Sequence, residues 1–221
     1  MRLRKLKNVD ERLEARKDIL VFEPETHKGK WRQLFKNDNP IYIEIGMGKG
    51  KFIIQHALSN PDINYIGIER EGSVLVKALE KVEVKPMNLY FIKADAVNIL
   101  DWFNDNEINK IYLNFSDPWP KVRHTKRRLT YGNNLDYYKK ILIDDGYIEF
   151  KTDNRHLFEY SIVNFINEGL YITDLSLNLH EDKENIITTE YEDKFTEKGN
   201  IIYFVEVKNG KNEVIWKISK P

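Results

Sequence analysis

One stretch of the sequence places a carboxylate, an aromatic ring and a run of cations directly after an apolar segment. The mostly apolar residues 110–113 lead into NFSDPWPKVRHTKRR at positions 114–128. Prolines end regular strand pairing, because each lacks an N–H and fixes its own φ. Asp117 and Trp119 are therefore expected on a stiff loop at the end of a strand, where open α/β sheets bind their ligands.

The cations of this stretch form a local basic cluster in a chain whose formal net charge is zero. Residues 121–128 hold five Lys or Arg and residues 2–7 hold four, in both cases without an acid, whereas residues 181–197 hold seven Asp or Glu against two Lys. Phosphate groups respond to local basic patches rather than to the summed charge, so a nucleic-acid partner is one interpretation. Two solvated basic segments are the alternative.

A second stretch, IYIEIGMGKGKF at positions 41–52, ends an expected strand in a glycine turn. Gly46 and Gly48 let the backbone turn sharply and approach a ligand closely. A dinucleotide fingerprint would need a third glycine at position 51, which is Lys51, so a dehydrogenase is disfavoured. Glu44 lies inside the strand, and a buried carboxylate is costly unless it is paired. A cationic ammonium group of a ligand would pair it.

Acids also end the next two expected strands. Glu69, 23 residues after Gly46, is placed to accept both hydroxyls of a ribose, although a solvated strand-end acid is its alternative. Asp95 follows the third strand, where the exocyclic amine of an adenine could donate to it. Together with Glu44 and the glycine turn, these acids describe a pocket for adenosine joined to an amino-acid tail. S-adenosylmethionine is such a ligand, and the arrangement resembles a class I methyltransferase.

Regular alternation of strands and helices positions these residues. Buried strands are expected at residues 41–45, 65–68, 89–92, 111–115 and 147–150. Helix faces are expected from Leu75, Ala78, Leu79 and Val82, from Leu135, Tyr138, Ile141 and Leu142, and from Phe158, Ile162, Phe165 and Ile166. This alternation predicts an α/β fold, a Rossmann-like three-layer sandwich with a mostly parallel sheet. Residues 172–179 and 201–207 are expected to form an antiparallel C-terminal strand pair at a sheet edge.

Composition limits the remaining classes of protein. The 221 residues are expected to form a single domain, with a methyltransferase domain at 41–221 after a basic extension at 1–40. The chain has no cysteine, which excludes disulfides and thiolate metal sites, and its five histidines lack metal-ligand spacing, so no metal is expected. We expect no membrane span and no secretory signal, a cytoplasmic location, and a monomer or homodimer.

Four segments, IEIGMGKG, LNFSDPWPKVRHTKRRL, FKTDN and TEYEDKF, occur in the order typical of the bacterial tRNA (guanine-N7)-methyltransferase family. The resemblance covers almost the whole chain. It implies transfer of a methyl group from S-adenosylmethionine to the variable-loop guanine at position 46 of tRNA, leaving S-adenosylhomocysteine. It also implies a role for each matching residue. The cofactor contacts would be Glu44, Gly46, Gly48, Glu69, Asp95 and Asp117, the tRNA and guanine contacts Lys121, Asp153, Thr189, Glu190, Tyr191 and Glu192, and the RNA-facing residues Arg123, His124, Lys126, Arg127 and Arg128.

The chemistry of guanine agrees with that assignment. The N7 lone pair is free at neutral pH, so attack needs no general base, and rate must come from alignment, which can supply ~7–11 kcal/mol. With N7 facing the methyl group, recognition falls to the edge bearing N1–H and the 2-amino group, and these donors require carboxylates. Asp117 is the catalytic candidate, because an anion stabilises positive charge that develops on the purine.

Alternatives remain for the reaction and for single residues. Asp117 could instead accept a proton from an exocyclic amine of RNA or DNA, or cap its own turn. Trp119 could stack on a base or pack in the core. A non-catalytic RNA-binding protein on a nucleotide fold is the alternative from another class.

Overall fold

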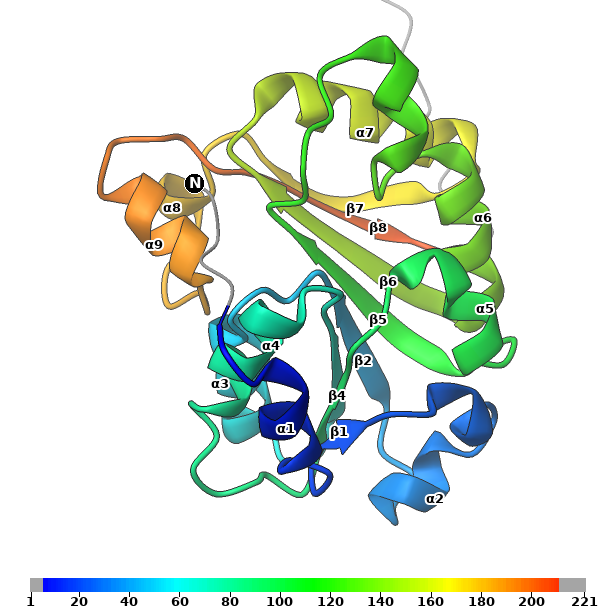
Figure 1. Ribbon diagram of the computed structural model, residues 1–221. Coiled ribbons are helices and arrows are strands. Elements are labelled where there is room, and N and C mark those ends of the chain that lie inside the picture. The colour runs from blue at the N-terminus through cyan, green and yellow to red at the C-terminus, as the bar shows by residue number, and fades with distance from the viewer. Residues whose placement is uncertain (1–5, 211–221) are drawn as a thin grey trace, which may run out of the picture.

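A computed structural model describes residues 6–210 of the chain. Within these residues, eight strands form one sheet in the order β1-β4-β3-β2-β5-β6-β8-β7 (Figure 1). The strands are β1 (Leu20–Val21), β2 (Ile41–Ile45), β3 (Asn64–Ile68), β4 (Leu89–Ile92), β5 (Ile108–Asn114), β6 (Leu142–Thr152), β7 (Tyr171–Ser176) and β8 (Tyr203–Lys208).

Strand directions confirm the predicted mixed sheet. The neighbours from β1 to β6 pair in parallel, whereas β8 pairs antiparallel with both β6 and β7. The C-terminal strand pair therefore closes one edge, as expected. Strand β6 is longer than the expected strand at 147–150, because it begins at Leu142 directly after a helix.

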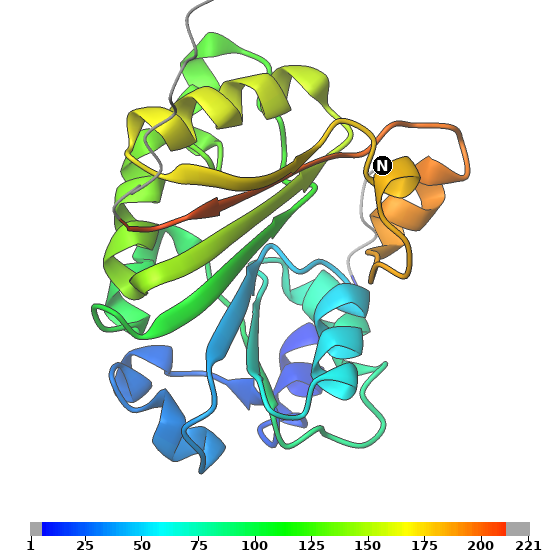
Figure 2. The ribbon, with the colours of Figure 1, turned by 180° about the vertical axis from the view of Figure 1, so that it is seen from behind.

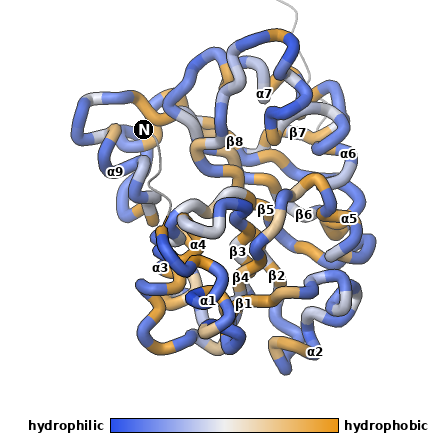
Figure 3. The backbone as a smooth tube through the Cα atoms, in the orientation of Figure 1, coloured by the Kyte–Doolittle hydropathy of each residue, from blue (hydrophilic) through white to orange (hydrophobic). Residues whose placement is uncertain are grey.

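Helices cover both faces of the sheet, and alternate residues of each strand feed two separate cores. One core contains Ile43, Ile66 and Ile111 together with apolar residues of α2 (Trp31–Phe35), α5 (Ile99–Trp102), α6 (Gly132–Ile141) and α7 (Arg155–Asn167). The other contains Tyr65, Phe91 and residues of α1 (Val9–Glu14), α3 (Lys51–Ser59) and α4 (Gly72–Leu79). Figure 3 shows hydrophobic residues, in orange, along the central strands and hydrophilic residues, in blue, over most outer turns. The arrangement is the predicted three-layer sandwich.

Two short helices, α8 (Leu179–Asp182) and α9 (Glu190–Thr196), stand apart from these layers. They lie on the connection between β7 and β8 and project beside the end of the sheet in both views (Figures 1 and 2). This connection is called the α9 arm below and comprises residues 177–202. The strands expected at 172–179 and 201–207 overlap its two ends, but β7 ends at Ser176 and β8 begins at Tyr203. Neither short helix was predicted, because the apolar pattern between the strands is too short.

The described part of the N-terminal segment is packed against the sheet rather than extending from it. Strand β1 adds to the edge beside β4, and Trp31 is fully buried with its indole N–H donating to the Trp102 carbonyl over 2.9 Å. We therefore propose one domain that includes residues 6–40. Arg2, Arg4 and Lys5 of the first basic cluster, and residues 211–221, lie outside the described residues.

Some expected helix positions fall beyond the helix ends. Helix α4 ends at Leu79, so Val82 is buried in the following turn, and α6 ends one residue before Leu142. Ile166 is on α7 but is 56% exposed, so it was wrongly assigned to the buried face.

No helix within residues 6–210 is both long enough and apolar enough to cross a bilayer.

Candidate active site

A cavity of about 690 Å³ lies at the carboxyl ends of the parallel strands β2, β3, β4 and β5. This is the edge of an open α/β sheet at which ligands bind. Its walls come from the turns after β2, β3 and β4, from the loop after β5 and from the α9 arm. The lining includes Gly46, Gly48, Glu69, Asp95, Asn114, Asp117, Trp119, Arg127 and Tyr191.

The glycine turn after β2 leaves room for a ligand against the backbone. Gly46 and Gly48 have φ of 75° and 59°, in the left-handed region that favours glycine. A Cβ added at either position would meet no atom within 4 Å. Both positions line the cavity, so a ligand can approach the main chain here without a side chain in its path.

Glu69 is fixed by main-chain N–H groups from two turns that line the cavity. Its two carboxylate oxygens accept hydrogen bonds from the Gly48 N–H at 3.1 Å and from the Glu71 N–H at 2.9 Å. Burial raises the pKa of Glu69, and these two bonds oppose the rise. Each oxygen keeps a further lone pair, and two such acceptors at one position suit the vicinal hydroxyls of a ribose.

Asp95 follows β4 at the outer end of the same wall. Its carboxylate accepts a bond of 3.3 Å from the Val97 N–H at the start of the 3₁₀ helix η2 (Ala96–Asn98), and it lies 3.8 Å from the Arg70 guanidinium. The side chain is exposed to the cavity. It therefore presents an acceptor on the same wall as Glu69, where the sequence predicted an adenine.

Glu44 lies beneath the cavity and acts through Asn114. Its side chain is 1% exposed, and its Oε1 accepts a hydrogen bond of 2.9 Å from Nδ2 of Asn114, which lines the cavity. Within the described residues, Glu44 Oε2 and Asn114 Oδ1 have no hydrogen-bond partner. Burial raises the pKa of Glu44 to about 7. Two unpartnered buried acceptors fit the ammonium group of an amino-acid tail, and the Asn114 amide is the one such a group meets first.

Asp117 lies on the turn after β5, between two residues in a strained conformation. Phe115 and Trp119 have φ of 49° and 41°, which costs a non-glycine residue roughly 1–2 kcal/mol. Within residues 6–210, the Asp117 carboxylate accepts no hydrogen bond, so the alternative that it caps its own turn is not supported. The Asp117 side chain is exposed and lines the same cavity as the glycine turn.

The α9 arm contributes Tyr191 to the opposite wall. The Tyr191 ring stacks on Phe195 with centroids 4.1 Å apart and contacts Phe115 at 5.0 Å. Its hydroxyl donates to Asp153 Oδ2 over 3.4 Å, and Asn200 donates to the same oxygen over 3.2 Å. Burial, with the nearby Asp153 carboxylate, raises the pKa of Tyr191. Asp153 and Tyr191, far apart in sequence, therefore meet beside the cavity.

Two residues of the α9 arm that were predicted to contact tRNA also stabilise the arm itself. Thr189 and Glu192 form the capping box of α9, with bonds of 3.0 Å and 3.3 Å between backbone N–H and side-chain oxygen. Glu192 is fully buried and also contacts Lys151 Nζ and His180 Nε2, each at 3.1 Å. The Glu192 carboxylate therefore stabilises the α9 arm in this structure, and its predicted contact with guanine stays a prediction. Glu190 is partly exposed and pairs with Lys81.

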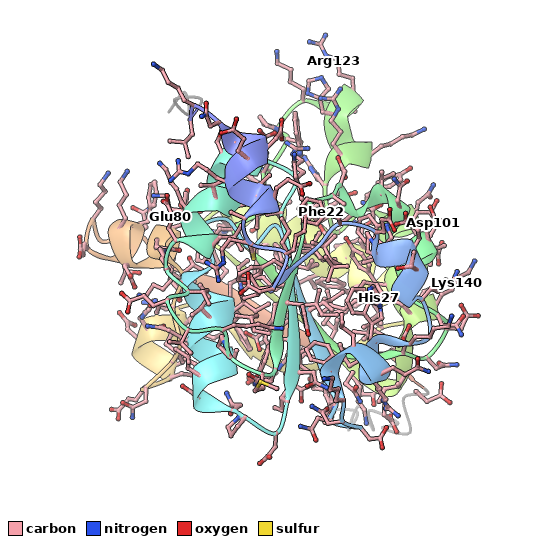
Figure 4. All side chains as sticks on the ribbon, turned by 60° about the horizontal axis from the view of Figure 1, so that its bottom comes forward. Phe22, His27, Glu80, Asp101, Arg123 and Lys140 are labelled. Atoms are coloured by element: carbon pink, nitrogen blue, oxygen red, sulfur yellow. The ribbon has the colours of Figure 1, made fainter. Side chains whose placement is uncertain are left out.

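The basic run lies on the 3₁₀ helix η3 (Val122–Arg127) at the rim of the cavity. Lys121, Arg123 and Lys126 are exposed, and Arg123 extends away from the body of the protein (Figure 4). The Arg127 guanidinium lies 4.9 Å from the centroid of the Trp119 ring, and His124 meets the same ring edge-on at 5.6 Å. Trp119 is thus part of the cavity wall, against the alternative of core packing. The Arg128 guanidinium does not face outward but donates to the carbonyls of the turn after Asp117.

Comparisons with known proteins agree with this site. Residues 38–205 match the model of a family described as "Putative methyltransferase". Over 210 residues, 94% of this chain, the sequence is 53% identical to the tRNA (guanine-N(7)-)-methyltransferase of Geobacillus sp. (strain WCH70), of which it covers 96%. It is 52% identical to the protein of the same name from Streptococcus pneumoniae (strain Hungary19A-6), of which it covers 100%. The chain belongs to the tRNA (guanine-N(7)-)-methyltransferase family.

Solved structures with the same fold are more distant in sequence than these methyltransferases. The 16S rRNA methyltransferase KamB superimposes with a TM-score of 0.62 at 11% identity, over 83% of this chain and 94% of that one. A variant of a 16S rRNA (adenine(1408)-N(1))-methyltransferase, solved with its cosubstrate SAM, superimposes with a TM-score of 0.60 at 11% identity. The match covers 85% of this chain and 93% of that one. At these identities the likeness shows the fold, which is that of class I methyltransferases.

Two residues of this methyltransferase site were missed from the sequence. Asn114 precedes the Asp117 turn and presents an unpartnered buried acceptor, and Lys151 anchors the α9 arm from within β6. Lys151 could have been noticed, because a lysine inside an apolar strand requires a buried partner. Asn114 carried no comparable signal, since asparagine is common in the turns that follow strands.

Within the described residues, no group of three or more His, Asp or Glu is arranged to hold a metal ion.

Proposed function

We propose that this chain transfers the methyl group of S-adenosylmethionine to N7 of the guanine at position 46 in the variable loop of tRNA. The observation that carries the proposal is the 53% identity to a tRNA (guanine-N(7)-)-methyltransferase across 94% of the chain. The cavity supports it, because acceptors suited to a ribose, an adenine and an ammonium group line one half of it. S-adenosylhomocysteine is the second product, tRNA is the partner, and the cytoplasm is the proposed place of action.

The cofactor supplies an electrophilic methyl carbon, and the protein supplies position. Glu69 and Asp95 hold the nucleoside, while Asn114, fixed by Glu44, receives the amino group of the tail. Asp117 lines the same cavity, and we place the entering base on its side. Holding two reactants in line supplies ~7–11 kcal/mol of the barrier, so no general base is required for attack by the free N7 lone pair.

Asp117 stabilises the developing charge, and nearby carboxylates recognise the guanine. Positive charge spreads onto the purine as N7 forms its bond, and the free carboxylate of Asp117 stabilises that charge. The N1–H and 2-amino donors of guanine then face carboxylates, for which Asp153 and Glu190 are the available candidates beside Tyr191. Lys121, Arg123, Lys126 and Arg127 hold phosphates at the rim, since the base must leave its stack to reach the cavity.

Unmodified tRNA and labelled S-adenosylmethionine provide the test. After incubation, the RNA is treated with borohydride and aniline, which cut at 7-methylguanosine, and digested nucleosides are identified by mass. We expect cleavage at position 46, and none in a control tRNA with adenine there. Label recovered as N6-methyladenosine, or any exocyclic methylated amine, would show that the acceptor is wrong.

A further inference from the structure

Arg128 contacts the turn that carries Asp117 rather than the solvent. Its Nε donates to the Pro118 carbonyl over 3.0 Å, and its Nη2 donates to the Trp119 carbonyl over 3.2 Å. One guanidinium therefore binds two successive carbonyls directly after Asp117. The neighbouring Arg127 faces the other way, over the Trp119 ring in the cavity wall.

The Asp117 turn has few other restraints. Pro118 and Pro120 have no N–H to donate, and Phe115 and Trp119 hold left-handed φ values on either side of Asp117. Among the described residues, the two Arg128 bonds are the hydrogen bonds that reach residues 116–120. A turn in a conformation that side chains rarely adopt needs such external support to persist.

Arg128 is itself fixed by two helices of the body. Its guanidinium lies 4.2 Å from the centroid of the Tyr160 ring on α7, a stacked cation–π arrangement. Its carbonyl accepts bonds from Tyr131 N–H at 3.1 Å and from Asn134 Nδ2 at 2.9 Å, at the start of α6. The side chain thus connects the turn to helices that are packed against the sheet.

We infer that Arg128 is a positioning residue for methyl transfer, acting on Asp117 through the Pro118 and Trp119 carbonyls rather than on an RNA phosphate. The inference rests on the proposed function, in which the Asp117 carboxylate faces the reacting atoms. Arginine suits the role, because its planar fork presents several N–H groups in fixed directions while its face stacks on a ring. Lysine is a point charge and cannot satisfy both carbonyls and the ring at once.

The experiment compares Arg128→Lys and Arg128→Ala with Arg127→Ala in the full chain. The readouts are kcat and KM for tRNA, the salt dependence of tRNA binding, and S-adenosylhomocysteine binding by calorimetry as a check on folding. For both Arg128 variants we expect kcat to fall roughly 10- to 100-fold, since a shift of about 1 Å at a reacting group can cost ~10²-fold. Their tRNA affinity and salt slope should match the wild type. Arg127→Ala should instead weaken tRNA binding and flatten the slope by about one unit.

Added guanidinium distinguishes positioning from a lost phosphate contact. Millimolar guanidinium chloride should partly restore kcat of Arg128→Ala, because it can reoccupy the site over Tyr160. It should not restore the tRNA affinity of Arg127→Ala. Unchanged kcat with a flattened salt slope in the Arg128 variants would overturn the inference. If Arg128→Ala does not fold, Arg128→Lys and Tyr160→Leu give the same comparison. If the wild type modifies a different base, the identity of the product shows that the proposed function is wrong. The ratio of variant to wild-type kcat is then measured on that base, which still tests the role of Arg128.

Discussion

The two halves of the cavity are held in place by different kinds of contact. The half proposed to bind the cofactor, here called the cofactor half, is formed by the glycine turn, Glu69 and Asp95. It lies on strand ends and is fixed by backbone N–H groups from neighbouring turns. The acceptor half, formed by the Asp117 turn and the α9 arm, is fixed by long side chains from distant elements, Arg128 and Lys151 among them. Single substitutions should therefore separate cofactor binding from methyl transfer.

Removing the charge of Asp117 should break the acceptor half most severely. We expect Asp117→Asn to lower the rate of transfer by ~10²–10³-fold or more, as loss of one electrostatic contact to developing charge does in other enzymes. Binding of S-adenosylhomocysteine and tRNA should change only a few-fold. Single-turnover transfer of labelled methyl groups measures the effect, with Asp101→Asn, an exposed acid on α5, as the matched control (Figure 4). Near wild-type turnover would remove Asp117 from the chemistry.

Breaking the buried pair of Lys151 and Glu192 should release the α9 arm. Both side chains are almost completely buried, at 3% and 0% exposure, so Lys151→Met leaves a carboxylate without its partner. Loss of one member of a buried pair costs ~3–5 kcal/mol, which denaturant unfolding would detect. The double variant Lys151→Met with Glu192→Gln should recover much of that stability, because it leaves no unpaired charge and keeps an acceptor oxygen for the capping box. Equal destabilisation in the single and double variants would show that packing, not charge pairing, anchors the arm.

Glu69→Gln should weaken the cofactor half without affecting the acceptor half. Hydrogen bonds to charged groups contribute ~1.5–3 kcal/mol, which corresponds to roughly 10- to 150-fold in affinity. Calorimetry with S-adenosylhomocysteine measures the loss, and the exposed Glu83→Gln serves as control. Binding of tRNA should stay at the wild-type level. A loss of tRNA affinity equal to the loss of cofactor affinity would mean that the two halves are not separable.

The pKa of Glu44 makes cofactor affinity depend on pH. Burial raises this pKa from 4.5 to about 7. Between these pH values the folded protein keeps the proton and the unfolded chain loses it. The unliganded protein therefore loses stability as pH rises from about 4.5 to about 7. A ligand ammonium favours the carboxylate, so cofactor affinity should rise with pH up to about 7 and then level off. Below about pH 7, cofactor affinity can fall by ~10-fold per pH unit. Calorimetry between pH 5.5 and 8 tests this, and a flat wild-type profile, like the one expected for Glu44→Gln, would contradict it.

The smallest effect is expected at the rim. Lys126→Ala should reduce the slope of log affinity against log salt by about one unit, as for each lost phosphate contact, without changing kcat at saturating tRNA. Fluorescence titration at several salt concentrations measures the slope, and the remote Lys140→Ala, at the end of α6, is the control (Figure 4). An unchanged slope would place the RNA away from η3.

Sequence patterns predicted the cofactor half better than the acceptor half, and the difference has a physical cause. Glycine turns and strand-end acids act within one segment, so Gly46, Glu69 and Asp95 could be located from strand periodicity alone. The acceptor half depends on contacts between segments, such as Arg128 with Pro118 or Lys151 with Glu192. The family resemblance and local charge assigned Arg128 and Glu192 to the RNA, because nothing in the local sequence distinguishes a buried charge from an exposed one. The packing of residues 6–40 was missed for the same reason.

A structure with bound S-adenosylhomocysteine tests the division of the cavity most directly. We expect the ribose hydroxyls at Glu69, the adenine beside Asp95, the amino group against Asn114, and the sulfur directed toward Asp117. Density for the product with its sulfur turned away from that aspartate, or lying along η3, would contradict it.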